Sequence, residues 1–161
     1  MKKIFLGLLV CAGLATEMRA QGGSCTNYHR MACAMEGSKK DAKEFMYNAQ
    51  SKSGLFAQGS VSKMRCVVYK GNDYRISVCC ETILGDKVNF KIFDAKTNEL
   101  LFDNTQNEDA QQFEFSAATT RPLVIEVAVP EGTTAADKGK TADAACVGLL
   151  IENKVSARVG F

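Results

Sequence analysis

The strongest pattern in this 161-residue sequence is an alternation of apolar and polar residues that begins after Ser53. The alternation comes in short runs, because Gly, Asn, Asp or Pro interrupts it again and again. A period of two is that of a β-strand with one buried face. We therefore expect a mainly β protein, an antiparallel β-sandwich of seven to eight strands. The runs lie at 64–69, 75–80, 88–93, 100–102, 112–115, 123–129 and 146–151.

Before Ser53 the apolar residues are spaced as in a helix. Two sets, at 28–35 and 42–49, each follow an i, i+3, i+4, i+7 pattern. Residues 37–40 separate them, so two short helices and one helix with a weak middle both fit. We expect this N-terminal helical segment to pack on the sheet with its apolar stripe. The alternative is that the stripe binds a partner.

Residues 1–20 have the layout of a secretory signal peptide. Lys2 and Lys3 precede an apolar run at 4–10, which small residues then continue. This run is shorter than the roughly 20 apolar residues that cross a bilayer. No later run approaches that length, so we expect no transmembrane helix in the mature chain.

We expect cleavage between Ala20 and Gln21, and a periplasmic or secreted location. An export signal that ends in Ala-Gln resembles those of exported proteins of the Bacteroidota. The minor alternative is a lipoprotein attached through Cys11. Val10 argues against it, because a lipobox has a small residue before its cysteine.

These patterns divide the chain into four parts. They are a signal peptide at 1–20, an N-terminal helical segment at 21–53, a β-sandwich domain at 54–153 and a C-terminal tail at 154–161. Within the sandwich, residues 131–145 are rich in Gly, Thr, Ala and Lys without periodicity, so we expect a loop there.

Removal of the signal peptide changes the net charge and the number of cysteines. The formal charge falls from +2 to zero, because Lys2, Lys3, Arg19 and Glu17 are lost. The number of cysteines falls from seven to six with the loss of Cys11. An even number in an exported chain indicates a disulfide framework. The candidates, whose pairing the sequence leaves open, are Cys25, Cys33, Cys66, Cys79, Cys80 and Cys146.

The order of the later strands resembles that of a known domain. Residues 87–103 read as a strand, an Asp-initiated turn and a returning strand, and strands at 113–116 and 122–129 follow. Over roughly residues 60–153 this order resembles the GOLD-type β-sandwich of secretory-pathway cargo proteins. It resembles more loosely the prepeptidase C-terminal sandwich of secreted bacterial enzymes.

The resemblance implies a non-catalytic module that binds proteins or lipids. It also implies a disulfide between an early and a late strand, which would join Cys79 or Cys80 to Cys146. The chain adds N-terminal helices and lacks the coiled coil and membrane helix of the eukaryotic family. A cargo-receptor function is therefore not implied.

Cys79 and Cys80 are adjacent on one predicted strand, so their side chains point to opposite faces. Cys80 shares the apolar face of Ile76 and Val78. We expect two disulfides that leave the strand in opposite directions, one inward to Cys146 and one outward to a cysteine of the helical segment. A redox switch and a zinc site are the alternatives, although the chain has no C-x-x-C motif.

Few residues are suited to catalysis. His29 is the single histidine, so any Ser-His or Cys-His centre needs it. It lies beside Arg30 on a polar helical flank, where we expect it to be solvated. The series 103–114 has the spacing of a calcium loop but carries Glu108 where that loop needs glycine. We expect no enzyme activity, no cofactor and no metal.

The sequence thus favours an exported, non-enzymatic interaction or accessory protein of the cell envelope, with another envelope or secreted protein as its partner. The alternative is a module that binds a small ligand, carbohydrate or lipid. The chain has no Trp and four Tyr, which offers little aromatic surface to a sugar ring. A thiol redox protein is the third hypothesis. Near-neutral mixed charge is not the pattern of a nucleic-acid-binding surface.

Overall fold

The computed structural model describes residues 25–33, 45–85, 87–131 and 144–157, and every structural statement below concerns these residues. The elements in chain order are α1 (Tyr28–Met31), β1 (Met46–Tyr47), β2 (Lys52–Phe56), β3 (Val61–Val68), β4 (Asn72–Cys80), η1 (Thr82–Leu84), β5 (Asn89–Asp94), β6 (Leu100–Asp103), η2 (Asn104–Gln106), β7 (Gln112–Ser116), β8 (Arg121–Ala128) and β9 (Ala145–Val155).

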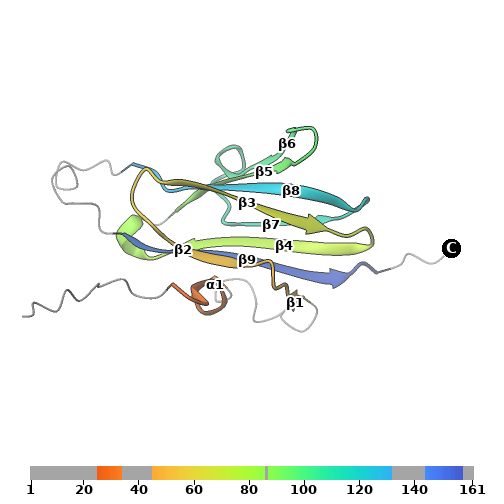
Figure 1. The fold of residues 1–161 in the computed structure, drawn as a ribbon, viewed down its shortest axis with the longest axis horizontal. Helices are drawn as coiled ribbons and strands as arrows, with labels where there is room; N and C mark the ends of the chain where they lie inside the picture. Colours follow the sequence, from red (N-terminus) through yellow and green to blue (C-terminus); the bar gives the residue numbers. More distant parts are fainter. Residues whose placement is uncertain (1–24, 34–44, 86, 132–143, 158–161) are drawn as a thin grey trace, which may run out of the picture.

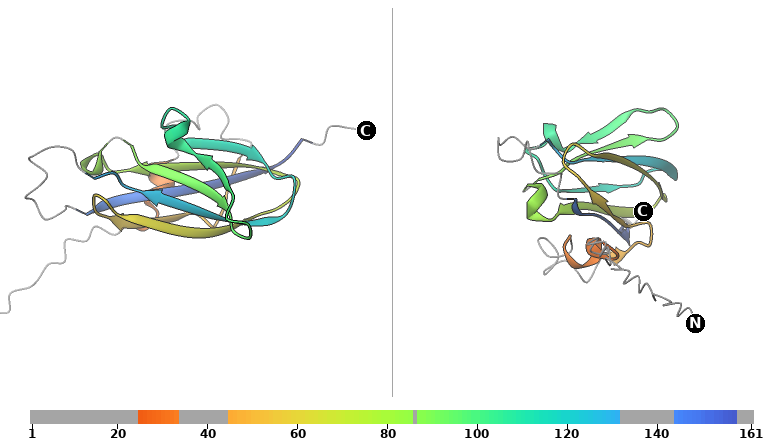
Figure 2. Two further views of the ribbon diagram at one scale, coloured as in Figure 1. Left: turned by 90° about the horizontal axis from the view of Figure 1, so that it is seen from above. Right: turned by 60° about the vertical axis from the view of Figure 1, so that its left-hand side comes forward.

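The strands form two antiparallel sheets that pack face to face, as the alternation predicted (Figure 1). Sheet A has the order β1-β9-β4-β7, and β2 also pairs with β9. Sheet B has the order β3-β8-β5-β6. Turned to the side, the molecule shows two layers, with α1 on the outer face of sheet A (Figure 2, right).

The core lies between the sheets and consists of the inward-facing residues of the alternating runs. Burial of such side chains contributes roughly 25 cal/mol for each Å² of apolar surface removed from water. The most deeply buried members are Tyr74 and Ile76 on β4, Phe90 and Ile92 on β5, Leu123 and Ile125 on β8, and Ile151 on β9.

A row of aromatic rings fills one edge of the sandwich, where β6 and β7 face each other. Phe102 of β6 stacks on Phe113 of β7, with ring centroids 4.0 Å apart. Phe90 continues the row on one side at 5.1 Å from Phe102, and Phe115 on the other at 5.5 Å from Phe113. Large rings from both sheets therefore close this edge.

The turn from β5 to β6 begins with an aspartate, as the sequence indicated. One oxygen of Asp94 accepts hydrogen bonds from the backbone N–H groups of Lys96 and Thr97, at 2.8 and 3.2 Å. Asn98 then adopts a left-handed conformation, with φ of 59°. Asn is one of the residues that tolerate this region.

The N-terminal segment differs from the sequence prediction. A helix is present at Tyr28–Met31, but the helix predicted over 42–49 is wrong in its described part, where Met46–Tyr47 is strand β1. Strand β2 begins at Lys52, inside the segment predicted to be helical. With these two strands, the described residues form nine strands. Pairing with β9 satisfies the backbone of this region and outweighs the local apolar spacing.

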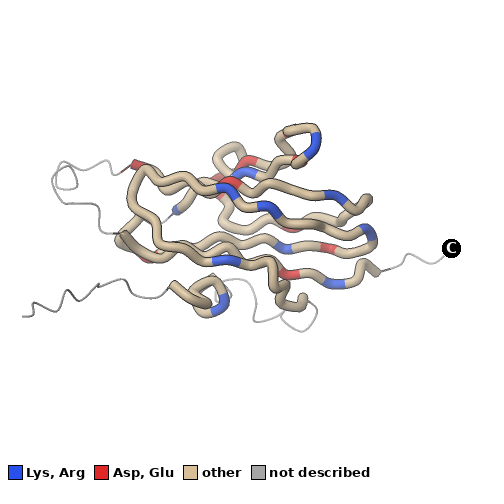
Figure 3. Tube along the Cα trace, in the orientation of Figure 1, with Lys and Arg blue, Asp and Glu red and all other residues tan. Residues whose placement is uncertain are grey.

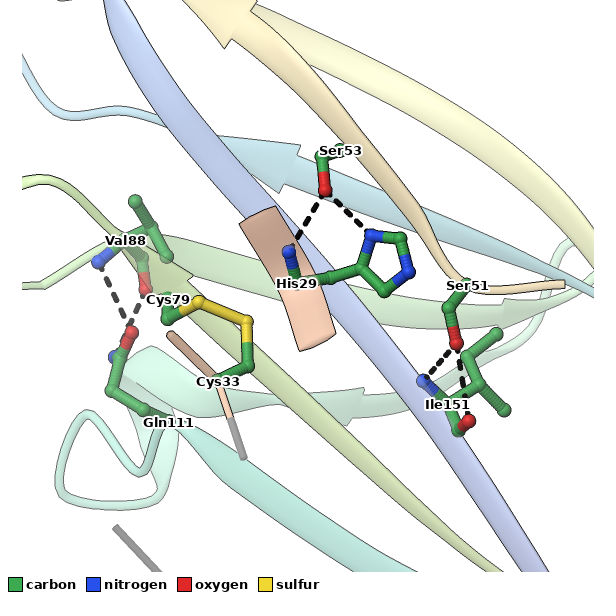
Figure 4. Close-up of a disulfide and its surroundings, with 8 residues drawn as sticks. All are labelled: His29, Cys33, Ser51, Ser53, Cys79, Val88, Gln111 and Ile151. Atoms are coloured by element: carbon green, nitrogen blue, oxygen red, sulfur yellow. Dashed lines mark hydrogen bonds between the residues drawn. A yellow bond between two sulfur atoms is a disulfide. The ribbon is translucent and has the colours of Figure 1, made fainter. Parts of the chain in front are cut away.

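The gap between β1 and β2 is closed by a serine. Ser51 is buried, and its hydroxyl accepts a hydrogen bond from Ile151 N at 2.9 Å and lies 3.1 Å from Ile151 O (Figure 4). The Ser51 hydroxyl thus makes the hydrogen bonds to β9 that the backbone of a paired strand would otherwise make. Strand β9 itself continues to Val155, two residues beyond the predicted sandwich boundary at 153. Most of the predicted loop at 131–145 lies outside the described residues.

Asp103 is expected to make the fold sensitive to acid. Burial alone raises its pKa, but hydrogen bonds from Thr105 and from Lys91 outweigh this, so the pKa lies below its usual value. The ionised form is therefore the one that the fold prefers. Its contribution is present above about pH 4 and is lost as the pH falls through the folded-state pKa.

We predict that Asp103→Asn lowers the free energy of unfolding by about 1–3 kcal/mol at pH 7, and that this difference shrinks towards about pH 2. Thermal unfolding across this range measures it. The control is Asp109→Asn, because that carboxylate pairs with Lys87 at the surface, where such pairs contribute about 0–1 kcal/mol. A difference that does not change with pH would contradict the prediction.

Candidate functional site

Two disulfides fix the start of the described chain to the outer face of sheet A. Cys25 is bonded to Cys146 of β9, and Cys33 is bonded to Cys79 of β4 (Figure 4). The two cysteines of the N-terminal segment flank α1, so the short helix is tied down on both sides. The pairs are 121 and 46 residues apart in sequence. Considered separately, closing loops of these lengths stabilises a fold by about 4–5 kcal/mol in the chain-entropy model.

The pairing agrees with part of the sequence argument and corrects the rest. The outward disulfide joins Cys79 to the helical segment, in the direction that was expected. The inward disulfide from Cys80 to Cys146 is not formed, and neither is the pair that the GOLD-type resemblance implied. In the β4–β9 register Cys80 lies opposite Val147, on the core side. Cys146, one residue earlier, points to the outer face and meets Cys25.

Cys66 and Cys80 lie outside these two disulfides. Cys66 is in the core, 3% exposed, and burial raises the pKa of its thiol to about 11. A thiol with so high a pKa is not a nucleophile at neutral pH. Cys80 is half-buried, and its Sγ lies 3.3 Å from the carbonyl oxygen of Gly85. The setting of Cys66 is therefore unlike that of a redox centre, which requires a low-pKa thiol.

His29 is buried, at 5% exposure, so the expectation of a solvated side chain is wrong. Its Nδ1 lies 2.6 Å from Ser53 Oγ, and its Nε2 lies 3.2 Å from the hydroxyl of Tyr47. The backbone N–H of His29 also donates to Ser53 Oγ, at 2.9 Å (Figure 4). Burial first, then the charges of Arg30 and Lys52, lowers the pKa of the imidazole. The ring is therefore neutral at pH 7.

These contacts give His29 a structural role. They connect α1 to β1 through Tyr47 and to β2 through Ser53. Among the described residues, no hydrogen bond or ion pair joins a carboxylate to the ring. This burial could not be predicted from the sequence, because the helix is four residues long and the flanking disulfides hold it in place.

The helix sits on a glycine of β9. A Cβ atom built on Gly148 would lie 2.8 Å from Cys33 Sγ and 2.8 Å from His29 Cα. Real Cβ atoms do not approach other atoms so closely, and the backbone of α1 has little room to move between its disulfides. Glycine in a strand often marks such a close approach. Gly148 is therefore what allows α1 to lie flat on sheet A.

Farther along the same face, one aromatic ring contacts two cations. The guanidinium carbon of Arg75 is 4.1 Å, and Lys154 Nζ 4.6 Å, from the ring centroid of Phe45. Arg75 is 4% exposed and donates to Glu114 at 2.7 Å. Its guanidinium also lies 3.8 Å from Glu152. Burial raises the pKa of Glu152, although the charge of Arg75 acts in the opposite direction. Phe45 thus covers the charged centre of the outer face.

Part of the docked segment stays in contact with solvent. Arg30 and Met31 of α1 are exposed, and Tyr47 of β1 is 42% exposed. The Arg30 guanidinium lies 4.4 Å from the centroid of the Tyr47 ring, which also stacks on His29. We call Arg30, Met31 and Tyr47 the α1 surface.

A second feature lies at the edge where β2 faces β3. A pocket of 120 Å³ opens here between the two sheets. We call it the seam pocket. Its lining is mostly apolar, with a few small or polar residues. The apolar residues are Phe56, Met64, Ile125, Val127, Val147 and Leu149, and the others are Lys52, Ser53, Gly54 and Ser62.

The acidic residues of the calcium-like series do not converge. Asp103 binds Lys91, and Asp109 binds Lys87. Glu114 belongs to β7 of the other sheet, where it binds Arg75. Across the described ranges no group of three or more His, Cys, Asp or Glu side chains is placed to hold a metal ion. In the same ranges no helix has the length and apolar character to cross a membrane.

Comparisons with known proteins find a likeness in fold but no family. No protein-family model matches the sequence, and the search of curated proteins finds no match. The fold is similar to that of Aeromonas hydrophila PliG, a periplasmic lysozyme inhibitor of g-type lysozyme. The sequences are 14% identical, the TM-score is 0.45, and the match covers 65% of this chain and 84% of that one. A likeness at this level carries no functional argument, and the GOLD-type resemblance rests on the sequence pattern alone.

We predict that Gly148→Ala displaces α1 from sheet A, lowers the free energy of unfolding by about 1–3 kcal/mol, and leaves Cys33 and Cys79 open to alkylation. Thermal unfolding and mass spectrometry after alkylation without reduction measure the two effects. The control is Gly54→Ala, whose Cβ would meet mainly the ring of Phe56, at 3.2 Å. If Gly148→Ala kept both disulfides and full stability, α1 would not depend on the close approach.

Proposed function

We propose that this protein is an exported, non-enzymatic interaction module of the cell envelope, with another envelope or secreted protein as its partner. The two disulfides support export, because such bonds persist in oxidising compartments and are rare in the cytosol. The signal-peptide pattern at 1–20, with cleavage between Ala20 and Gln21, supports the same location.

The observation that carries the proposal is the set of contacts that constrain the α1 surface. The Tyr47 ring stacks on His29 and contacts the guanidinium of Arg30, and α1 is flanked by a disulfide on either side. Tyr and Arg are among the residues enriched at the energetic centres of protein interfaces. Side chains that are already ordered lose less entropy when a partner binds. A tyrosine and an arginine, both exposed and both fixed, are suited to protein recognition.

The size of the seam pocket speaks against the small-ligand alternative. Ligand pockets commonly have volumes of about 300–1,000 Å³. The seam pocket, at 120 Å³, is well below this range. The thiol redox hypothesis is also weakened, since the buried Cys66 has a raised pKa.

We predict that a variant with Arg30→Glu and Met31→Ser loses at least ten-fold in capture of a partner. The experiment is cross-linking of the full-length protein in the envelope of its own cells, with quantitative mass spectrometry of what it captures. Charge reversal and loss of apolar area at exposed positions weaken binding without removing buried contacts. The intact mass of this protein itself, purified from the same cells without cross-linking, is expected to correspond to a chain that begins at Gln21.

The matched control carries the same two kinds of change at Lys96→Glu, in the turn between β5 and β6, and Leu100→Ser, at the start of β6, both exposed. The wild type and this control are expected to capture the same protein in equal yield. Equal capture by all three proteins would contradict a role for the α1 surface. A thermal shift with a small molecule and no captured protein would favour the ligand-binding alternative.

A further inference from the structure

We propose that the seam pocket and the edge of β3 together bind an extended, acidic segment of a partner protein. The segment adds to sheet B as a further strand beside β3 and places one side chain of Leu or Phe size in the pocket. This surface lies at the β2–β3 edge, and the inference does not depend on whether the α1 surface binds anything.

The pocket results from the choice of residues at this edge. On the opposite edge, Phe102 and Phe113 fill the space between the sheets. At the β2–β3 edge the register places Gly54 opposite Val147 and Ser62 opposite Val127, so both face inward with those core residues. Glycine and serine leave unfilled the volume that an apolar side chain occupies elsewhere in the core.

The volume indicates what fits. An apolar cavity of about 150 Å³ binds one benzene molecule, so a pocket of 120 Å³ accepts one apolar group of about that size. Most side chains that line the pocket are apolar, among them Ile125, Val127, Val147 and Leu149. A single Leu or Phe side chain, carried on a larger partner, therefore fits better than a whole lipid or sugar.

The backbone of β3 is available for pairing on its outer edge. Ser60 O accepts a hydrogen bond from Val129 N, at 2.9 Å, so the backbone N–H and C=O groups of even-numbered residues of β3 point toward β8. Those of odd-numbered residues point away from β8, and Val67 is an example. Its N–H donates to Gln50 Oε1 at 2.7 Å, and its carbonyl accepts from Gln50 Nε2 at 3.0 Å. The side-chain amide of Gln50 occupies the place of a backbone amide on a neighbouring strand.

The same alternation turns the backbone groups of Lys63 and Arg65 toward this open side. Both residues are exposed, as is Val61 at the start of the strand. Gln50 ends the accessible stretch at Val67, so an added strand can pair with Val61–Arg65. Peptides that add to an exposed edge gain affinity from such backbone bonds and specificity from pockets for their side chains.

Charge decides which kind of strand fits. Basic positions follow β3, and one lies on the neighbouring β2 (Figure 3). They are Lys63, Arg65 and Lys52, all exposed. Glu126 lies 2.9 Å from Lys63 and offsets part of that charge, which leaves the edge basic. Two copies of this edge would bring like charges together, so self-pairing is disfavoured and an acidic segment is favoured.

The experiment selects nine-residue peptides from a random display library against the oxidised, full mature protein. We expect the enriched peptides to alternate, with acidic residues on one face and one central Leu or Phe. Binding of a synthetic consensus peptide is expected to slow amide hydrogen exchange at Lys63 and Arg65 at least ten-fold, and to weaken with added salt.

Variants separate the two parts of the site. Ser62→Leu fills the pocket from its own side and is expected to weaken the peptide at least ten-fold, whereas Thr119→Leu, an exposed position elsewhere, leaves the affinity unchanged. Arg65→Glu is expected to lose the acidic peptide and to bind its lysine-substituted counterpart. Arg30→Glu with Met31→Ser retains peptide binding, so failure of the α1 surface is distinguishable from failure of this proposal.

Three results would overturn the inference. One is a selected set without acidic or apolar preference. Another is octanoate binding in the pocket, with no peptide that protects the amides of Lys63 and Arg65. The third is a concentration-dependent dimer that protects the same two amides without any peptide, because the occupant of the edge is then a second copy of the chain.

Discussion

The pairing of β4 with β9 is the interaction on which the rest of the structure depends. The register runs from Asn72–Val155 to Cys80–Val147, and each strand presents one face to the core and the other to the N-terminal segment. On the core side this pairing supplies Tyr74, Ile76 and Ile151. On the outer side it brings Cys79 beside Gly148, which is the place where α1 docks. The β4–β9 register therefore determines both the packing of the core and the position of α1 on sheet A.

The short helix α1 is stabilised on the outer face of sheet A by contacts other than a hydrophobic core. The helix α1 has four residues and is too short to be stable alone. Disulfides, the contacts of His29 and the absence of a side chain at Gly148 replace the apolar burial that a longer helix would provide. The result is a surface in which Arg30 and Tyr47 are exposed and yet constrained.

The sequence predicted the parts of the fold that depend on local pattern. Alternation identified the strands from β3 to β9, and the adjacency of Cys79 and Cys80 indicated opposite faces. What it missed depends on tertiary contacts. The apolar spacing around Phe45 and Met46 is helical, but an unpaired edge of β9 recruits that segment as a strand. The burial of His29 depends on Gly148, whose role is visible only when α1 lies on it.

One edge of the sandwich is closed by side chains, and the other leaves a pocket and part of a strand edge exposed. Aromatic rings close one edge, and on the other Gln50 covers only the end of β3. Amide hydrogen exchange of the oxidised protein without any ligand tests this account most directly. It predicts slow exchange at His29 and Val67, whose N–H groups are bonded to Ser53 and Gln50, and fast exchange at Lys63 and Arg65 in the same strand as Val67. Fast exchange at His29, or equal protection along β3, would contradict it.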